Sequence, residues 1–425
     1  MLVDLKNKIR KIYEIFKEVN LKDSTDKLKE CDIIFFCHDV DRSLFLSHCA
    51  YSPLIDSVRD EFEKRGFLCD SISLPWSVLT GKRGYGFPIC INRSMFSQKV
   101  KSYLLKITRL NQIFRIDNIY NKILIKTKVK LIISIGSPDD LSHAARSNKV
   151  FHVELLHGMG YTTLPWGWSD KPSEFLPQGI LALDNISHET FKPLASKGIE
   201  IEMIPHPFLK RFLNADSDEF PHEWVPKKNN EQKWRKEILI SFQWAYAGDH
   251  GPHTEYANIL QNGLFYDEIE QIVKEEDEVL FRFRFHPIQL KNAKYKSLGQ
   301  FMNFFVEKYP NTEWKESSFL PYPSIVKSCS GNISMSSMSC YDAAAMGVPT
   351  LMLCPTIQHG GVHEEWYEDL VKEGYVTKNR VDKKLLQNWV QSTEKIEPRL
   401  SNLKDEGGWE NAVEWLLSES GLKRS

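Results

Sequence analysis

The sequence lacks the features of a membrane-spanning or secreted chain. No segment approaches the run of about 18 apolar residues that a bilayer-spanning helix needs. The first 20 residues read as a charged amphipathic helix without the hydrophobic centre of a signal peptide. We therefore expect a cytoplasmic protein.

Disulfide and metal-binding patterns are also missing. The eight cysteines include no CxxC pair and no Cys/His spacing typical of a metal site. Several of them lie inside apolar runs, so we interpret them as reduced and mostly buried. We expect no metal requirement.

The chain has no excess of charge of one sign, since its formal net charge is -1. A dedicated nucleic-acid binder needs a basic surface, so nucleic acid is not an expected partner. One segment, 93–130, carries ten Lys or Arg against a single acid, Asp117. We favour a solvated face there; the alternative is a basic amphipathic helix on anionic lipid, at the periphery of the inner membrane.

What the sequence does contain is an alternation of short apolar runs with helical patterns. The 425 residues suit two domains of about 200 residues each. Strands buried between helices produce this pattern, so it predicts an α/β fold with two Rossmann-like domains facing a cleft. The apolar runs lie at 31–37, 130–136, 150–156, 179–184, 237–244, 278–285 and 349–355, and helical patterns at 52–67, 187–198 and 297–311.

A polar, proline-bearing stretch marks the predicted domain boundary. Residues 213–236 contain no run long enough for a core strand, so we interpret them as a linker. The predicted domains are 1–212 and 237–385. The helices expected in 386–425 can pack back on the first domain.

His286 is the first candidate for a phosphate site. It follows the run 278–285, and ligands of open parallel sheets gather at the carboxyl ends of strands. Pro287 fixes the chain there, and the imidazole can donate to a phosphate oxygen or, when cationic, offset its charge. The alternative is a strand-end histidine satisfied by a backbone carbonyl.

A serine cluster is the second candidate. Ser336, Ser337 and Ser339 precede a short predicted helix that ends at Gly347. Hydroxyls and the free amides of a helix N-terminus together form an anion site. The alternative is simple capping by one of the serines, although four serines in "SMSSMS" exceed that need.

The first domain supplies "VELLHGMGYTTLPWGW". Gly158 and Gly160 permit a tight turn with close approach of a substrate after the strand. Glu154 can orient His157, bind sugar hydroxyls or act as a general base, or it can form a structural salt bridge. Trp166 can stack on an acceptor sugar or a base, or it can belong to the core.

Asp249 stands in the loop after the first strand of the second domain. It is a candidate nucleophile or base, and the alternative is a turn-forming aspartate. His250 and His253 lie nearby, but their spacing matches no metal template.

Together, HG at a strand end, HP in the second domain and serines before "AAAMGVPTL" resemble bacterial GT-B glycosyltransferases. The HP and SS pair is similar to that of enzymes using cytidine-linked donors, foremost Kdo transferases of capsule and lipopolysaccharide synthesis. The resemblance implies that His286, Ser336 and Ser337 contact the CMP phosphate, and that Glu154 and Asp249 are catalytic. The acidic motif of sialyltransferases is absent, which disfavours sialic acid.

These patterns predict a transferase that moves a Kdo-like sugar from a CMP-sugar to a glycan or glycolipid acceptor of a surface polysaccharide. The first domain would then bind the acceptor and the second the donor, with no cofactor besides that donor. Three alternatives stay open: a CDP-glycerol-type polyol-phosphate transferase, a UDP-sugar transferase or epimerase, and a non-catalytic scaffold that binds nucleotide sugars.

Overall fold

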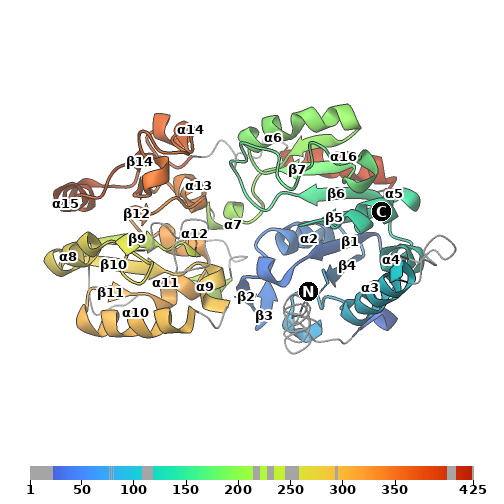
Figure 1. Ribbon diagram of the computed structural model, residues 1–425, viewed down its shortest axis with the longest axis horizontal. Coiled ribbons are helices and arrows are strands. Elements are labelled where there is room, and N and C mark those ends of the chain that lie inside the picture. Colours follow the sequence, from blue (N-terminus) through green and yellow to red (C-terminus); the bar gives the residue numbers. More distant parts are fainter. Residues whose placement is uncertain are drawn as a thin grey trace. The chain divides into compact units, whose positions relative to one another are not determined.

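The chain forms two compact α/β units (Figure 1). The first comprises Met1–Phe208 with Asp405–Ser425, and the second comprises Leu209–Lys404. The computed structural model describes residues 23–75, 77, 79, 81–107, 118–213, 221–226, 234–244, 258–291, 295–399 and 408–423.

The first unit contains a six-stranded parallel sheet in the order β4-β1-β5-β6-β7-β8. The strands are β1 Ile33–Cys37, β4 Cys69–Ser73, β5 Leu131–Ser134, β6 Phe151–Leu155, β7 Gly179–Ala182 and β8 Glu200–Met203, with an antiparallel hairpin of β2 Leu44–Leu46 and β3 Cys49–Tyr51. The helices are α2 Ile55–Lys64, α3 Asn92–Ile107, α4 Ile119–Thr127, α5 Asp139–Ser147, α6 Asn185–Phe191 and α16 Gly408–Ser420.

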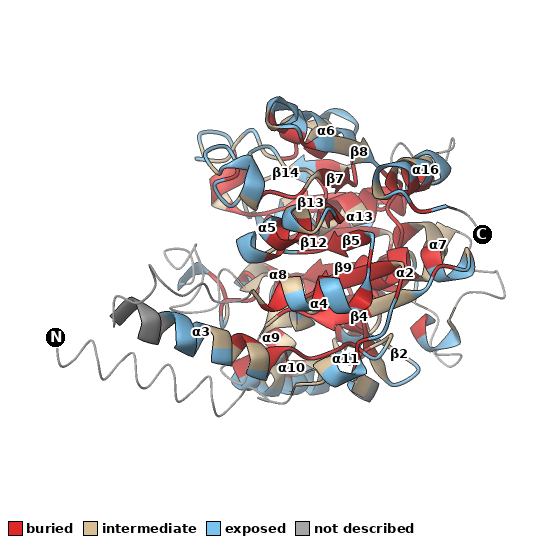
Figure 2. Cartoon of the chain, turned by 90° about the vertical axis from the view of Figure 1, so that its right-hand side faces the viewer, coloured by how far each residue is buried: buried red, intermediate tan, exposed pale blue. Residues whose placement is uncertain are grey.

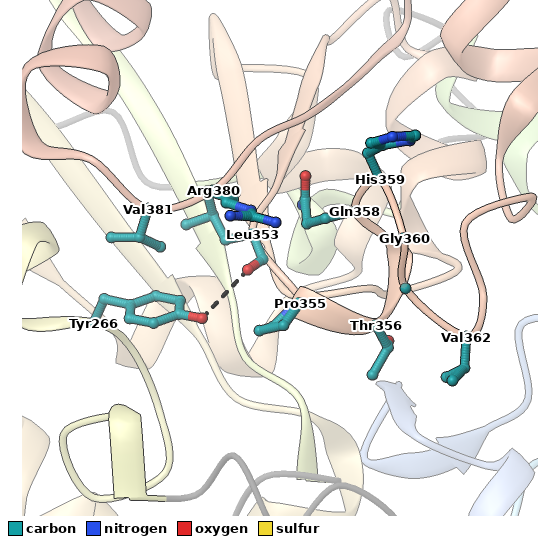
Figure 3. A pocket seen from close by; sticks show the side chains of 11 residues that line it. Tyr266, Leu353, Pro355, Thr356, Gln358, His359, Gly360, Val362, Arg380 and Val381 are labelled. Carbon is teal, nitrogen blue, oxygen red and sulfur yellow. Dashed lines mark hydrogen bonds between the residues drawn. The ribbon is translucent and has the colours of Figure 1, made fainter.

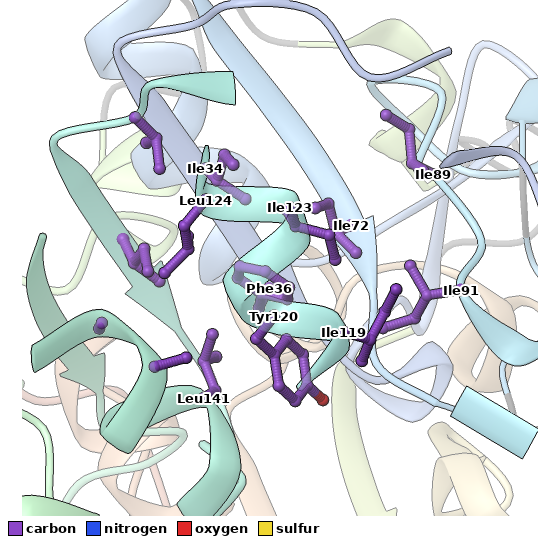
Figure 4. Packing of buried hydrophobic residues seen from close by; sticks show 14 of the residues in the cluster. Ile34, Phe36, Ile72, Ile89, Ile91, Ile119, Tyr120, Ile123, Leu124 and Leu141 are labelled. Carbon is purple, nitrogen blue, oxygen red and sulfur yellow. The ribbon is translucent and has the colours of Figure 1, made fainter. Parts of the chain in front are cut away.

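One large apolar cluster fills the space between this sheet and the helices on one of its faces (Figure 4). Phe36 from β1 and Tyr120 from α4 meet edge to face, with ring centroids 6.0 Å apart. Ile123 and Leu124 lie on the same buried side of α4. Thus α4, the second half of the basic segment 93–130, places its apolar side in the core.

The second unit repeats the architecture with the strand order β11-β10-β9-β12-β13-β14, again all parallel. The strands are β9 Lys236–Ser241, β10 Val279–Arg284, β11 Thr312–Glu313, β12 Gly331–Ser334, β13 Thr350–Met352 and β14 Val376–Lys378. The helices are α7 Leu209–Leu213, α8 Asp267–Glu275, α9 Pro287–Lys291, α10 Lys296–Lys308, α11 Lys315–Phe319, α12 Tyr322–Val326, α13 Ser339–Ala345, α14 Glu368–Lys372 and α15 Lys383–Ser392.

These sheets confirm the predicted fold class of Rossmann-like α/β domains. Each of the seven apolar runs contains a strand, and the strands are buried while helices carry exposed outer faces (Figure 2). Gly347 ends α13 with a φ of +72°, the left-handed conformation expected at a helix end. No helix among the described residues is long and apolar enough to cross a bilayer.

The last helix, α16, belongs to the first unit. Trp415 donates from Nε1 to Glu200 Oε2 at 2.7 Å and packs edge to face on Phe151. Glu410 pairs with Arg65, the residue directly after α2. The preceding helix α15 stays with the second unit, where Gln387 and Gln391 donate to Glu276 Oε1 at 3.0 and 2.6 Å.

Candidate functional site

Glu154 lies near the carboxyl end of β6 and holds the loop that follows β5. Its carboxylate accepts the Gly136 amide at 2.6 Å, the Ser137 hydroxyl at 2.6 Å and the Ser134 hydroxyl at 2.8 Å. Burial raises the pKa of Glu154 to about 7, although these hydrogen bonds lower it. With 1% of its surface exposed, the side chain organises the loop from within.

His152 shares the same hydroxyls. Its Nε2 lies 2.9 Å from Ser134 Oγ and 3.0 Å from Ser137 Oγ. When Glu154 is ionised and accepts both hydroxyl protons, Nε2 is the donor to the serine oxygens. Burial lowers the pKa of His152 to about 3, so the ring is neutral and the network is structural at neutral pH.

His157 lies just beyond β6, at the surface. Its ring nitrogens face the Tyr161 hydroxyl, the shorter distance being 2.9 Å to Nδ1. Lost hydration lowers the pKa of His157, and the negative charge of Asp41 opposes this shift. A neutral imidazole at a strand end is suited to accept a proton from a hydroxyl substrate.

The sequence reasoning missed the loop after β1, which contributes His38 and Asp41 to this edge. Asp41 Oδ2 accepts the His38 amide at 3.0 Å. Gly136 brings the β5 loop close to His38, because a Cβ built on Gly136 would lie 3.6 Å from the His38 ring. Polar residues directly after a buried strand, "CHDVDR", were the available indication.

Gly158, Gly160 and Trp166 lie on the loop that continues from β6. The Gly160 amide donates to Asp184 Oδ2 at 2.7 Å, and Gly160 has a φ of +75°. Trp166 is 47% exposed and Trp168 only 4%. The loop therefore presents one indole to solvent and buries the other.

His286 lies just beyond β10 in the second unit. Its Nδ1 accepts the Ile288 amide at 3.2 Å, which leaves the proton on Nε2. Burial lowers the pKa of His286 to about 4, with Arg284 acting in the same direction. The ring is therefore neutral at pH 7 and offers one fixed donor, whereas the sequence had allowed either nitrogen and a cationic form.

The serines have defined partners. Ser336 donates its amide and its hydroxyl to Gln243 Oε1, at 2.9 and 3.2 Å, and so joins the loops after β9 and β12. Ser337 Oγ accepts the amide and the hydroxyl of Ser339, the first residue of α13, at 3.2 and 2.9 Å, while the N-cap position itself is Met338.

A second group at this edge went unnoticed in the sequence. The Arg284 guanidinium lies 5.4 Å from the ring centroid of Tyr322 and donates to Leu320 O at 2.8 Å. Burial raises the pKa of Asp342, on α13, to about 7, against the charge of Arg284. Asp342 is thus a second carboxyl beside the serine cluster that exchanges its proton near neutral pH.

A cavity of about 360 Å³ lies beyond β13 and β14 (Figure 3). Tyr266, Gln358 and Arg380 reach it from three segments, and Tyr266 donates to Leu353 O at 3.3 Å. Within the described residues, the exposed Arg380 guanidinium has no hydrogen-bond or ion-pair partner. The cavity therefore offers a free cation to a ligand.

The structure brings Glu154 and His157 to one sheet edge, and His286 and the serines to another. Asp249 lies outside the described residues, as do His250 and His253. Over the ranges that are described, no three His, Cys, Asp or Glu side chains gather as metal ligands would.

Comparisons with models of protein families and with curated proteins give no match. Among solved structures, the chain is similar to S. aureus MnaA with UDP, at 12% identity over 93% of this chain and 98% of that one, with a TM-score of 0.50. UDP-GlcNAc 2-epimerase from Methanocaldococcus jannaschii shares 12% identity over 91% and 99%, with a TM-score of 0.51. Medicago truncatula UGT71G1 with UDP-glucose shares 11% over 94% and 100%, at 0.44.

The first two likenesses extend over nearly the whole of both chains. They establish the fold, a pair of Rossmann-like units of the GT-B type. That is the architecture the sequence predicted.

Proposed function

We propose that this chain is a GT-B enzyme acting on a nucleotide sugar, with a UDP-linked donor bound by the second unit. The sequence alone favoured a CMP-sugar, with Kdo as the transferred group. The uridine alternative gains support because the two similar folds were solved with UDP or named for UDP-GlcNAc. The reaction we favour is transfer of the sugar to a glycan acceptor.

His286 carries the proposal. Its Nδ1 is engaged by the Ile288 amide, and its Nε2 proton is held at the carboxyl end of β10. A fixed neutral donor is suited to a phosphate oxygen whose charge grows as the bond to the sugar breaks. Arg380 follows β14, which three strands separate from β10 in the sheet, so its guanidinium is a separate candidate contact for an anionic group of the donor.

The proposed acceptor chemistry lies in the first unit. His157 would take the proton of the attacking hydroxyl, with the charge of Asp41 favouring the imidazolium that forms. Glu154, whose carboxylate accepts four hydrogen bonds from Ser134, Gly136 and Ser137, would position the β5 loop. Asp249 stays the candidate nucleophile for a retaining mechanism, and an inverting one needs only the base.

The test is thermal unfolding of the full chain with UMP, UDP, CMP, CDP or GDP at matched millimolar concentration. A ligand at 100 times its Kd stabilises the folded state by about 2.7 kcal/mol. We expect UDP to raise the Tm most and His286→Asn to reduce that rise. Asparagine keeps an acceptor for the Ile288 amide and removes the donor at Nε2.

His222→Asn is the matched control, since His222 is an exposed histidine of the same unit. A rise confined to CMP or CDP would restore the cytidine hypothesis. Equal rises in Tm for wild type and His286→Asn would mean that His286 does not contact the nucleotide. No rise in Tm with any nucleotide would favour a protein that binds none of them.

An epimerase is the second candidate, because one similar fold is that of a UDP-GlcNAc 2-epimerase. Epimerisation needs no acceptor. Incubation with UDP-GlcNAc alone, followed by NMR of the sugar, separates the two: a new epimer identifies an epimerase, and an unchanged donor favours the transferase.

A further inference from the structure

Trp166 occupies a backbone position that tryptophan rarely takes. It and Gly167 have φ values of +57° and +67° and form the centre of a turn closed by the Trp168 amide on Pro165 O at 3.2 Å. Two successive positive φ values define a type I′ turn, whose preferred pair is Asn-Gly. A bulky side chain there is strained and persists only where the surroundings impose it.

The surroundings do impose it. The Lys197 ammonium donates to three carbonyls of this loop, at 3.2, 2.6 and 2.8 Å to Trp168, Ser169 and Lys171. Trp168 packs edge to face on the buried Phe191, at 5.8 Å between centroids. The Lys197 ammonium and Phe191 thus hold this loop through contacts that do not involve the Trp166 side chain.

Trp166 forms the outer layer of this aromatic group. Its ring centroid lies 5.2 Å from that of Trp168, 5.7 Å from His157 and 6.2 Å from Tyr161. It is nevertheless 47% exposed. An indole face in solvent, bordered by an imidazole and a phenol hydroxyl, combines an apolar plane with hydrogen-bonding groups at its rim.

We infer that Trp166 is a stacking platform for a pyranose ring, the acceptor sugar of the proposed transferase, on whose function this inference rests. A pyranose has one face of axial C–H groups and a rim of hydroxyls, which matches an indole plane edged by His157 and Tyr161. The sugar would stack on Trp166 and direct a hydroxyl at the His157 ring, the proposed base.

The test replaces Trp166 by asparagine, the residue that this turn prefers. Trp166→Asn should keep or raise the Tm, because it relieves strain at position 166. A purely structural tryptophan would instead lower it. Phe87→Asn is the matched control, because Phe87 is 64% exposed in the same unit and has a φ of +53°.

Saturation-transfer NMR supplies the binding readout, with methyl β-D-glucopyranoside, methyl β-D-galactopyranoside and N-acetylglucosamine as probes. We expect the strongest transfer to H1, H3 and H5, the apolar face of the glucoside. Affinity should fall about fivefold or more in Trp166→Asn and stay unchanged in Phe87→Asn.

Three outcomes would overturn the platform. The first is no saturation transfer to any pyranoside, and the second is equal transfer to the pyranosides from wild type and from Trp166→Asn. The third is transfer to UMP that is lost in Trp166→Asn, which would make Trp166 a contact for a nucleotide base. Stabilisation by UDP is measured in parallel on both proteins. If UDP binds and pyranosides do not, only this inference fails; if UDP binds neither protein, the proposed function fails as well.

Discussion

Burial decides the protonation of the candidate residues. His152 and His286 are held neutral at pH 7 because their pKa values fall to about 3 and 4. Glu154 and Asp342 move the other way, to about 7. In each unit, therefore, burial gives a neutral imidazole and a carboxyl whose pKa lies near 7, and perturbed pKa values of this kind are common at functional sites.

Glu154→Gln tests whether this carboxyl holds a proton in the folded state. With a folded pKa of about 7 and an unfolded value near 4.5, Glu154 stabilises the fold below pH 4.5 and loses this contribution as the pH rises through 7. The difference in unfolding free energy between wild type and Glu154→Gln should therefore decrease by up to about 3 kcal/mol between pH 4 and 8.

Urea unfolding at each pH measures this difference. Glu154→Ala should be less stable than either protein at every pH, since the Gly136 and Ser137 amides and the buried Ser134 hydroxyl lose their acceptor. A difference that is constant with pH would mean that Glu154 titrates alike in both states. A variant of unchanged stability but lost turnover would make Glu154 a catalytic residue.

At the scale of elements, one strand in each of the two sheets begins with a glycine that a tryptophan ring covers. A Cβ built on Gly179, in β7, would lie 2.6 Å from Trp415 of α16. One built on Gly331, in β12, would lie 2.6 Å from Trp389 of α15. In both units, therefore, a helix late in the chain packs on the sheet through a tryptophan ring that lies directly over a glycine of a strand.

Gly331→Ala should destabilise the second unit by about 1–3 kcal/mol, because the added methyl group overlaps the Trp389 ring. Trp389→Leu removes the outer ring atoms, so in the double variant the alanine should cost clearly less. Thermal unfolding of the four proteins gives the coupling. Additive effects of the two changes would contradict this packing.

Gly299→Ala is the control. A Cβ there would lie at an ordinary 3.8 Å from Trp314, inside α10. Alanine should stabilise that helix by up to about 1 kcal/mol. The same Gly→Ala substitution beside a tryptophan is thus expected to lower the free energy of unfolding at position 331 and to raise it at position 299.

How well the sequence predicted each strand depends on how completely that strand is buried. Apolar runs predicted strands that are buried on both faces, such as β1 and β10. They missed β4, "CDSIS", and the edge strand β8, "EIEM", because polar side chains interrupt the run. The sequence indicated site residues that stand next to Gly or Pro, such as His286. It gave no sign of Asp342, which lies inside the helical pattern of α13, or of its spatial neighbour Arg284, which comes from the distant strand β10.

At the scale of the whole molecule, the chain passes from the first unit to the second near residue 209 and returns near 405. The first unit is therefore completed by α16, which lies about 200 residues further along the chain than the rest of that unit. Within α16, five side chains are buried: Trp409, Ala412, Val413, Leu416 and Leu417. Burying a large apolar side chain contributes about 1.5–3 kcal/mol before the entropy of ordering the helix is subtracted, so removing one of these side chains should clearly weaken the first unit.

Val413→Ser tests whether the two units unfold separately. Val413 is fully buried and its neighbour Glu414 is exposed, so Glu414→Ser is the matched control. A buried hydroxyl in place of the isopropyl group should destabilise the first unit by about 2–3 kcal/mol. Hydrogen exchange should then speed up in β6, β7 and β8 and stay unchanged in β9 and β10. Equal acceleration in both sheets would mean that the units unfold as one, and the cost of losing α16 would then fall on the second unit as well.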